Sequence, residues 1–435
     1  MSDLLIVNGT VLDPSQNLQR GADVLIREGK IAEIGAGLRA RAEGVRVVDA
    51  GGCYVTPGLI DIHVHFREPG QEAKETIATG SAAAVAGGFT TVCCMPNTQP
   101  ALDDATQIEF VYTQAARAGL CTVLPVGAIT KGRKGAELAE MALMHEAGAI
   151  GFSDDGIGVG SAAVMLKALQ YVKMFGGIIT QHCEEPTLSG GPMSSGLTAT
   201  RLGLGGLPPV AEELMIARDI QLNARIGARY HVQHISTAGA VELVRRAKRE
   251  GQPVTAEVSP HHLLLTDEAC GTLNGGYDTN TKMNPPLRSA KDVAACIAGV
   301  VDGTIEVLAT DHAPHTREEK EQEFDKAPFG IVGLETALGL YARALVTPGH
   351  LTWMQLIEKM TVNAARVMDI GRRRAGAGTL AVGGCGDVTV IDPEAAWKAE
   401  PAAFKSKSRN TPFGGWELKG KVRATVVGGR VVYGG

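Results

Sequence analysis

Between about residue 57 and residue 347, one pattern recurs eight times. A short apolar, β-rich run ends in polar residues, and an Ala- and Leu-rich stretch that closes at glycine follows it. The eight runs are, in order, GLIDIHVHF, GFTTVCCMPN, LCTVLPVGAIT, GAIGFSDD, GGIITQHCEE, ARYHVQHIS, QPVTAEVSPHH and TIEVLATDHAP. Glycine just past a helix adopts the left-handed cap at low steric cost, which supports these boundaries. Alternating strands and helices predict parallel strands. Eight units therefore favour a closed (β/α)8 barrel of the TIM type over a doubly wound open sheet.

The two ends of the chain have a different pattern. Residues 1–56 and 376–435 contain short apolar runs separated by Asn-Gly, Glu-Gly-Lys and Gly-Gly, which are hairpin signals. Two independent β tails would each expose strand edges, so we predict one small composite β-sandwich domain built from both termini. The barrel then spans residues 57–375, and a helix over TWMQLIEKMTVNAARVMDI, residues 352–370, is expected to link the two parts.

Composition limits the kind of protein that this chain can be. Hydrophobic residues make up 44% and charged residues 20%, values typical of soluble globular proteins. The net charge of −5 gives no reason to expect nucleic acid or an acidic membrane as a partner. Eight scattered cysteines without CxxC spacing indicate buried thiols in a reducing compartment. Neither a signal peptide nor an apolar run of about 18 to 20 residues is evident, so we expect a cytoplasmic protein that acts on a small molecule.

Polar side chains follow most of the predicted strands. In barrel enzymes the chemistry lies at the carboxyl ends of the strands, so the residues there are the candidates for function. They are His63, His65 and Arg67 after the first run, Asn97 after the second, Asp154 and Asp155 after the fourth, His182 and Glu184 after the fifth, His234 after the sixth, and Asp311, His312 and His315 after the eighth.

The first run alone suggests a metal site. His63 and His65 are two residues apart, so both side chains point to the same face of a strand and can bind one ion. A lone strand histidine is more often a structural residue. The convergence with two further histidines and an aspartate favours a metal centre, because imidazole and carboxylate together suit zinc or a similar divalent ion.

This ligand set fits one metal ion or two. In a two-metal site a carboxylate must bridge, and Asp154 or Asp155 could do so, although adjacent residues face opposite ways and both cannot serve equally. Asp311 beside the ion could take a proton from water and pass it to a leaving nitrogen, as general base and then general acid. The pattern therefore indicates metal-assisted hydrolysis of an amide-like bond. His231 should face away from the centre and is expected to pack.

The motifs resemble the cyclic amidohydrolases and, among them, the class I dihydroorotases. The resemblance covers nearly the whole chain, through DIHVHFREPG, GGFTTVCCMPNT, GFSDDG, HCEE, HVQHIS, EVSPHHLLLT, KMNPPLR, ATDHAPH and KAPFGIVGLETA. It implies a (β/α)8 barrel with a composite β domain. It also implies zinc ligands at the positions His63, His65, Asp155, His182, His234 and Asp311. Many superfamily members bridge two metals with a carboxylated lysine. The SDDG segment has no lysine, so the number of zinc ions, one or two, stays undecided.

The resemblance further implies a reaction and its substrate contacts. The reaction is the reversible hydrolysis of dihydroorotate to N-carbamoyl-L-aspartate in de novo pyrimidine biosynthesis. The matching substrate contacts are Arg67, Asn97, Asn284 and His315, with backbone groups at Phe329 and Gly330. A guanidinium pairs bidentately with a carboxylate. The resemblance implies that allantoinase-like and hydantoinase-like relatives have no comparable clamp at this position, so Arg67 argues against their substrates. Two alternatives remain: an allantoinase-like or hydantoinase-like cyclic amidohydrolase, and an inactive homologue that scaffolds aspartate carbamoyltransferase. We also expect a homo-oligomer, with that enzyme as a possible partner.

Overall fold

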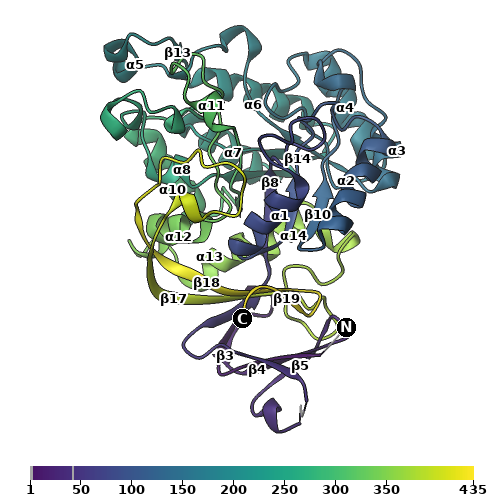
Figure 1. Cartoon of the computed structure of the whole chain (residues 1–435). Helices are drawn as coiled ribbons and strands as arrows, with labels where there is room; N and C mark the ends of the chain where they lie inside the picture. The colour runs from purple at the N-terminus through teal and green to yellow at the C-terminus, as the bar shows by residue number, and fades with distance from the viewer. Residues whose placement is uncertain (1–2, 42–43) are drawn as a thin grey trace.

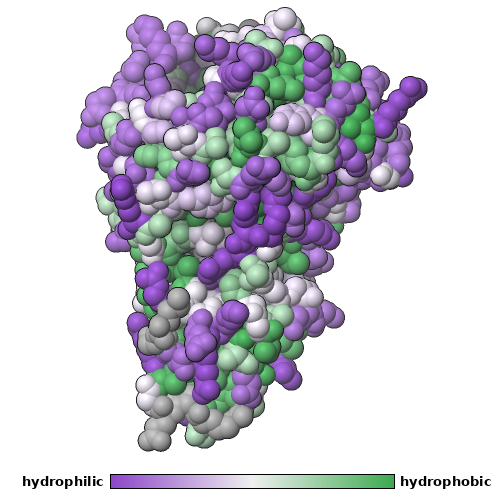
Figure 2. Space-filling view, turned by 90° about the vertical axis from the view of Figure 1, so that its right-hand side faces the viewer, coloured by the Kyte–Doolittle hydropathy of each residue, from purple (hydrophilic) through white to green (hydrophobic). Residues whose placement is uncertain are grey.

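The structure is a computed structural model that describes residues 3–41 and 44–435. The predicted terminal β domain thus includes residues 1–2 and 42–43, which lie outside the described residues. Figure 1 shows helices and strands packed together in the upper part of the view, and strands from both ends of the chain in the lower part. Within the described residues, no helix is both long and apolar enough to span a lipid bilayer. Figure 2 shows hydrophilic residues over much of one face, with smaller hydrophobic groups between them.

Seven of the eight predicted runs contain strands, and all of these pair in parallel. One sheet has the order β10-β9-β8 and another has the order β11-β14-β15-β16. Their bounds are β8 (Leu59–Val64), β9 (Phe89–Cys94), β10 (Thr122–Pro125), β11 (Ile178–Gln181), β14 (Arg229–Val232), β15 (Val254–Val258) and β16 (Val307–Leu308).

The fourth run, residues 148–155, differs from the prediction. Only Phe152 pairs, in parallel with Gly127 after β10 and with Ile179 of β11. The run stays short because the chain turns immediately afterwards, where the Asp154 carboxylate accepts hydrogen bonds from the backbone N–H groups of Ile129 and Thr130. Phe152 nevertheless connects the edges of the two parallel sheets. On the opposite edges, a parallel bridge joins Val64 to His312.

Each predicted helical stretch between the strands contains a helix. Hydroxyl or carboxylate side chains cap several of them: Thr76 and Asp104 accept backbone hydrogen bonds at the start of α1 and α2. The helices are α1 (Ile77–Ala86), α2 (Ala105–Ala118), α3 (Met141–Ala147), α4 (Ala162–Met174), α6 (Val210–Asn223), α7 (Ala238–Arg249), α10 (Ala290–Val301) and α12 (Ala337–Tyr341), the last continuing as a π turn over Ala342–Val346.

Strands from the two ends of the chain share a sheet. A six-stranded sheet has the order β19 (Arg430–Gly434), β18 (Glu417–Val427), β17 (Val388–Lys398), β7 (Tyr54–Pro57), β2 (Thr10–Asp13) and β3 (Leu18–Gly21). A four-stranded sheet has the order β5 (Lys30–Gly35), β4 (Asp23–Arg27), β1 (Leu4–Val7) and β6 (Arg46–Asp49). Side chains of both sheets, among them Ile6 and Val390, belong to one buried apolar cluster.

The predicted single helix over residues 352–370 is instead two helices, α13 (Trp353–Lys359) and α14 (Val362–Val367). Thr361 between them has φ −136° and ψ −94°, which is not helical. The break frees the carbonyl group of Met360 to accept a hydrogen bond of 2.8 Å from the backbone N–H of Ile60 in β8. Pairing with a strand therefore interrupts the helix.

Candidate metal centre and substrate pocket

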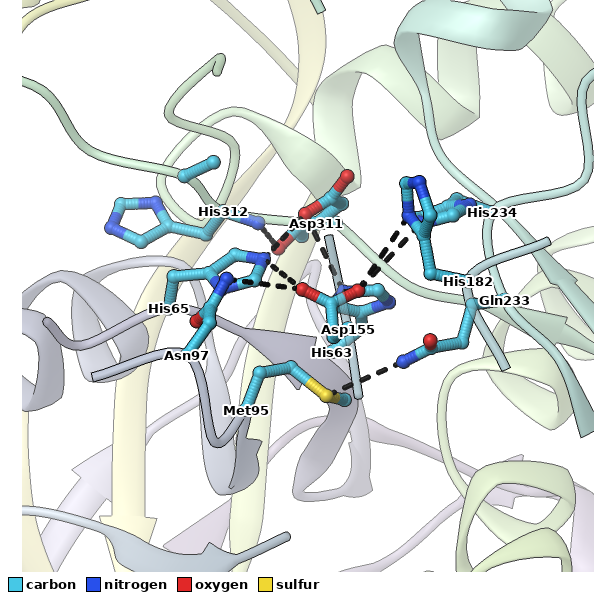
Figure 3. A network of polar contacts seen from close by, with 12 residues as sticks. His63, His65, Met95, Asn97, Asp155, His182, Gln233, His234, Asp311 and His312 are labelled. Carbon is cyan, nitrogen blue, oxygen red and sulfur yellow. Dashed lines mark hydrogen bonds and ion pairs between the residues drawn. The ribbon is translucent and has the colours of Figure 1, made fainter. Parts of the chain in front are cut away.

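The six predicted metal ligands lie together at the carboxyl ends of the parallel strands. His63 belongs to β8, and His65 and His182 come directly after β8 and β11. His234 and Asp311 follow β14 and β16 by two and three residues, and Asp155 lies three residues after the bridging residue Phe152. All six are between 0% and 4% exposed. Figure 3 shows Asp155 between histidines from both sides of the site. The set is His63, His65, Asp155, His182, His234 and Asp311.

The donor atoms form two overlapping groups. In His63, His65 and Asp311, and again in His63, Asp155 and His234, one possible donor atom from each residue lies within 4.8 Å of the others. His65 Nε2 is 2.9 Å from Asp311 Oδ1, and His63 Nε2 is 3.3 Å from Asp155 Oδ1.

His182 extends the second group. Its Nδ1 lies 2.9 Å from His234 Nε2 and 3.9 Å from Asp155 Oδ1. These two imidazole nitrogens therefore lie next to each other and beside the same carboxylate oxygen, which is 3.8 Å from His234 Nε2. The structure thus brings all six predicted residues into one cluster.

These residues have the chemistry that a divalent cation requires. Among the described residues, His63 Nε2 and Asp155 Oδ1 are fully buried and make no hydrogen bond. Buried polar atoms without a partner are costly, and a bound ion would satisfy them. Imidazole nitrogens and carboxylate oxygens in this number suit zinc.

The two neighbouring aspartates have different partners. Asp154 faces the loop after β10, where its Oδ1 accepts hydrogen bonds of 2.9 and 3.0 Å from two backbone N–H groups. Asp155 faces the histidines, and its Oδ2 also accepts a hydrogen bond of 3.2 Å from Asn97. Geometry therefore favours Asp155 as the candidate bridging carboxylate, as the family resemblance implied.

Burial and charge act in opposite directions on the ionisable groups of the cluster. Burial raises the pKa of Asp155, but His63 and His65 outweigh it and hold that pKa well below its ordinary value. Asp311 behaves in the same way, and its pKa is also lowered. Burial lowers the pKa of His63, whereas the carboxylates of Asp311, Glu257 and Asp155 together raise it well above normal. Both aspartates are consequently ionised at neutral pH and available to a cation.

Three site residues have left-handed backbone conformations although none is glycine. The φ angles are +61° at Arg67, +29° at His234 and +49° at Asp311. Such conformations cost about 1 to 3 kcal/mol each and concentrate at functional sites. The surrounding contacts therefore hold these three side chains in directions that an extended strand end would not give them.

A cavity of about 270 Å³ opens beside the cluster. Five of the six predicted substrate contacts line it, namely Arg67, Asn97, Asn284, His315 and Phe329. The sixth, Gly330, packs closely against His315 and Ala313. A Cβ at Gly330 would come within 2.5 Å of the Ala313 carbonyl oxygen and 2.6 Å of the His315 ring, so only glycine fits there.

One side of the cavity carries the basic side chains of Arg67 and Lys74, of which Lys74 is paired with Glu319 at 3.0 Å. Arg67 is buried, its Nε donates to the Pro314 carbonyl oxygen at 3.2 Å, and its terminal nitrogen lies 3.4 Å from His315 Nε2. Lys74 also lines the cavity, with its Nζ 3.5 Å from His315 Nδ1. Burial, together with the charges of Arg67 and Lys74, lowers the pKa of His315, so its ring stays neutral. This side is suited to an anionic group.

The side-chain amides of Asn97 and Asn284, two of the predicted substrate contacts, differ in which hydrogen-bonding atoms remain free. Asn97 Oδ1 lies 2.8 Å from His65 Nδ1, and its Nδ2 donates to Asp155, so both ends of the amide already contact candidate ligands. Asn284 Nδ2 donates to Glu184 Oε2 at 2.8 Å, while its buried Oδ1 has no hydrogen-bond partner among the described residues. Asn284 is therefore the amide with a free acceptor.

Two residues of the site were missed by the sequence reasoning. Glu257 of β15 contacts His63 and His231, so His231 is hydrogen-bonded as well as packed. Asn410, almost 100 residues after His315, accepts a hydrogen bond from the backbone N–H of His315 and donates to the carbonyl oxygen of Gly330. A buried glutamate within a strand was a weak signal for the first, and no local pattern marks the second.

Comparison with known proteins gives a consistent assignment. The family profile described as "Dihydro-orotase-like" matches residues 52–240. The chain is 55% identical to a dihydroorotase of Pelotomaculum thermopropionicum over 99% of this chain and 98% of that protein. It is 50% identical to a dihydroorotase of a Geobacter species over 99% of both chains.

Solved structures of hydantoinases have a similar fold. The L-hydantoinase (dihydropyrimidinase) of Arthrobacter aurescens superposes with a TM-score of 0.88 at 28% identity, covering 100% of this chain and 96% of that one. The D-hydantoinase (dihydropyrimidinase) of a Thermus species has a TM-score of 0.81 at 27% identity, covering 98% and 94%. The fold is thus the α/β fold of cyclic amidohydrolases, and the clustered histidines and aspartates match the metal dependence of that group. Full-length identity of about one half shows that the chain belongs to the dihydroorotase family of cyclic amidohydrolase enzymes.

Proposed function

We propose that this chain catalyses the reversible, zinc-dependent interconversion of dihydroorotate and N-carbamoyl-L-aspartate in de novo pyrimidine biosynthesis. The observation that carries the proposal is the buried Arg67 beside the cluster of six candidate ligands, in a chain half identical to named dihydroorotases. The guanidinium offers paired N–H donors to the carboxylate on the substrate ring, and the cluster offers imidazole and carboxylate ligands to a metal ion.

The candidate ligands suggest how one or two zinc ions would be held. His63, His65 and Asp311 would hold one ion, and His182 and His234 a second, with Asp155 shared between them. When bound, such an ion polarises a carbonyl group and lowers the pKa of water enough for hydrolysis near neutral pH. The group of His63, His65 and Asp311 supports the first half of this division, and the 2.9 Å between His182 Nδ1 and His234 Nε2 supports the second.

Asp311 is the proposed catalytic acid–base residue. It lines the cavity and its lowered pKa keeps it ionised, so it can accept a proton from the attacking water. It then delivers that proton to the ring nitrogen as the amide bond breaks. The reverse reaction uses the same group in the opposite order.

The substrate carboxylate is proposed to bind at the basic side of the cavity, between Arg67 and His315. Asn284 is oriented to accept a hydrogen bond from the ring N–H through its free Oδ1. Backbone groups at Phe329 and Gly330 would complete the polar contacts. Asn97, whose amide already contacts His65 and Asp155, would act mainly by orienting those ligands.

The closed barrel and the composite β domain are part of this proposal. The parallel bridges at Phe152 and between Val64 and His312 support a closed (β/α)8 barrel over residues 57–375. Antiparallel pairing of β17 with β7 and the shared apolar cluster support a β sandwich formed by residues 1–56 and 376–435.

The proposed activity is tested by comparing dihydroorotate, hydantoin and allantoin as substrates, with and without a chelator. We expect turnover of dihydroorotate alone, lost after chelation and restored by zinc. Preferred turnover of hydantoin or allantoin would overturn the substrate, and turnover that survives complete metal removal would overturn the zinc requirement. An inactive chain would support the scaffold alternative, which the complete set of candidate ligands argues against.

The cytoplasmic location, the homo-oligomer and the association with aspartate carbamoyltransferase stay predictions. Light scattering after size-exclusion chromatography of the chain, alone and mixed with that enzyme, tests the last two.

A further inference from the structure

A buried glutamate in the neighbouring strand contacts two of the candidate ligands. Glu257 lies in β15 and is about 1% exposed. Its Oε1 is 2.5 Å from His63 Nδ1, and the same oxygen accepts a hydrogen bond of 3.3 Å from the backbone N–H of His234. One carboxylate therefore links ligands that come from β8 and from the end of β14.

The contact with His63 determines which ring nitrogen is free. A carboxylate accepts hydrogen bonds, so His63 must carry a hydrogen on Nδ1 to bond with Glu257. Nε2 is then the ring nitrogen left to bind a cation, and it lies 3.3 Å from Asp155 and 3.5 Å from Asp311. This is the ring orientation that a metal ligand needs.

The contact with His234 acts on the backbone instead of the ring. His234 has a φ of +29°, a conformation that a non-glycine residue keeps only when its surroundings enforce it. The hydrogen bond from its N–H to Glu257 stabilises this turn, which points the side chain toward Asp155, 3.8 Å away.

Glu257 is itself held from the other side. His231 Nε2 lies 3.1 Å from Glu257 Oε2, and His231 Nδ1 lies 2.7 Å from the Thr255 hydroxyl group. With a hydrogen on Nε2 of His231, the ring donates to Glu257 and accepts from Thr255. Each hydrogen bond along Thr255, His231, Glu257 and His63 then joins one donor to one acceptor.

We propose that Glu257, supported by His231 and Thr255, is a positioning residue that orients His63 and His234 for metal binding. The proposal rests on the metal centre of the proposed function. It adds that one carboxylate outside the ligand set serves both donor groups, because His63 belongs to both and His234 to one.

The test measures zinc affinity of the metal-free protein by competition with a chromogenic chelator, which does not depend on turnover. We expect Glu257→Ala to weaken zinc binding about 10- to 100-fold, the usual effect of removing a partner of a metal ligand. Glu257→Gln keeps one acceptor oxygen for His63 and should lie between wild type and Glu257→Ala, which also covers the case in which the alanine variant folds poorly.

The supporting residues give a graded expectation. His231→Leu should weaken zinc binding less than Glu257→Ala, and Thr255→Val less again. Because His231 acts through Glu257, adding His231→Leu to Glu257→Ala should cause little further loss. A full additional loss in the double variant would overturn the supporting role of His231.

A matched control removes a buried carboxylate elsewhere. Asp13 is fully buried in the terminal strands, where it accepts hydrogen bonds from Ser15 and Leu380. Asp13→Ala should lower stability and leave zinc affinity unchanged. Wild-type affinity in folded Glu257→Ala and Glu257→Gln would overturn this inference, whereas a wild-type chain that binds no zinc would overturn the proposed metal centre beneath it.

Discussion

At the scale of single residues, neighbouring side chains in this site have sharply different surroundings. Asp154 is hydrogen-bonded to backbone N–H groups of a loop, while Asp155 faces four histidines. Arg67 is two positions beyond His65, yet a positive φ turns it toward the basic side of the cavity beside His315. Residue type selects the chemistry that is possible, and the local backbone decides which partner each side chain meets.

Arg67→Ala should impair use of dihydroorotate while leaving the metal in place. Loss of a charge-assisted contact worth about 1.5 to 3 kcal/mol predicts a fall in kcat/KM of roughly 10- to 100-fold, chiefly through KM. Steady-state kinetics and zinc content of the same preparations measure the two effects. Arg67→Lys keeps the charge but not the planar fork and should recover part of the activity. Loss of zinc from Arg67→Ala would show that Arg67 is structural.

Asp311→Asn should remove most of the turnover. An amide cannot accept the proton of water, and positioned acid–base groups contribute typically 10²- to 10⁴-fold, so we expect a loss of kcat in that range. The assay is run with saturating zinc, since Asp311 is also a candidate ligand. Near-normal kcat would exclude Asp311 as the proton acceptor.

At the scale of elements, short segments at the carboxyl ends of the strands shape the pocket. Helix α11 (Arg317–Lys320) ends at the buried Lys320, whose Nζ donates to the carbonyl oxygens of Pro328 at 2.9 Å and Gly330 at 3.2 Å. The same loop presents Phe329 to the cavity. A helix of one turn thus anchors the backbone groups proposed to contact substrate.

Lys320 should make stability depend on pH. Burial, with a smaller contribution from Lys282, lowers the pKa of Lys320 to about 7 from its usual 10.5. Between these values the unfolded chain binds more protons than the folded chain, so the free energy of unfolding rises with pH. The cost of burying the charge is complete below about pH 7 and absent above about pH 10.5.

Lys320→Met removes the contribution of this lysine to the pH dependence of stability. The difference in unfolding free energy, wild type minus variant, should increase by on the order of 2 kcal/mol from pH 7 to pH 9. Denaturant titrations at several pH values measure it. Lys419→Met, at an exposed position in β18, is the control and should show a constant difference. A constant difference for Lys320→Met as well would contradict the prediction.

At the scale of the whole molecule, the C-terminal part of the chain returns to the site. After β17, the yellow segment in Figure 1 rises beside the helices of the upper part. Within it, Asn410 Nδ2 donates to the carbonyl oxygens of Ala313 and Gly330 at 2.9 Å, and Oδ1 accepts from the backbone N–H of His315 at 3.1 Å. One amide therefore joins the end of the chain to two loops of the pocket.

Asn410→Ala should raise KM for dihydroorotate several-fold and leave zinc binding intact. It leaves three buried backbone groups without their partner, which costs about 1 to 3 kcal/mol each and loosens the loop that carries His315. Kinetics and zinc content are the measurements. Asn223→Ala is the matched control, because Asn223 makes a similar pair of buried backbone hydrogen bonds at Ala228, away from the pocket. An equal rise in KM in both variants would indicate general destabilisation.

The sequence by itself determined the features that depend on local periodicity and on residue type. Strand runs, glycine-terminated helices and the polar residues that follow each strand are all local, and the order of motifs identified the family. Five candidate ligands could be named because parallel strands bring their carboxyl ends to one edge, and the sixth, Asp155, was implied by the family resemblance. Local pattern does not distinguish Asp154 from Asp155, because adjacent residues of an extended segment point to opposite faces and the sequence does not show which face is turned to the site.

Only the tertiary structure decided the contacts between segments that are distant in sequence. Four features depend on where another element lies. They are the single pairing residue of the fourth run, the break at Thr361, the contacts of Glu257 with His63 and His234, and the contact of Asn410 with His315. A hydrogen bond over tens or hundreds of residues leaves no period in the sequence. Such bonds form because a buried donor or acceptor must find a partner, and packing determines which partner is within reach.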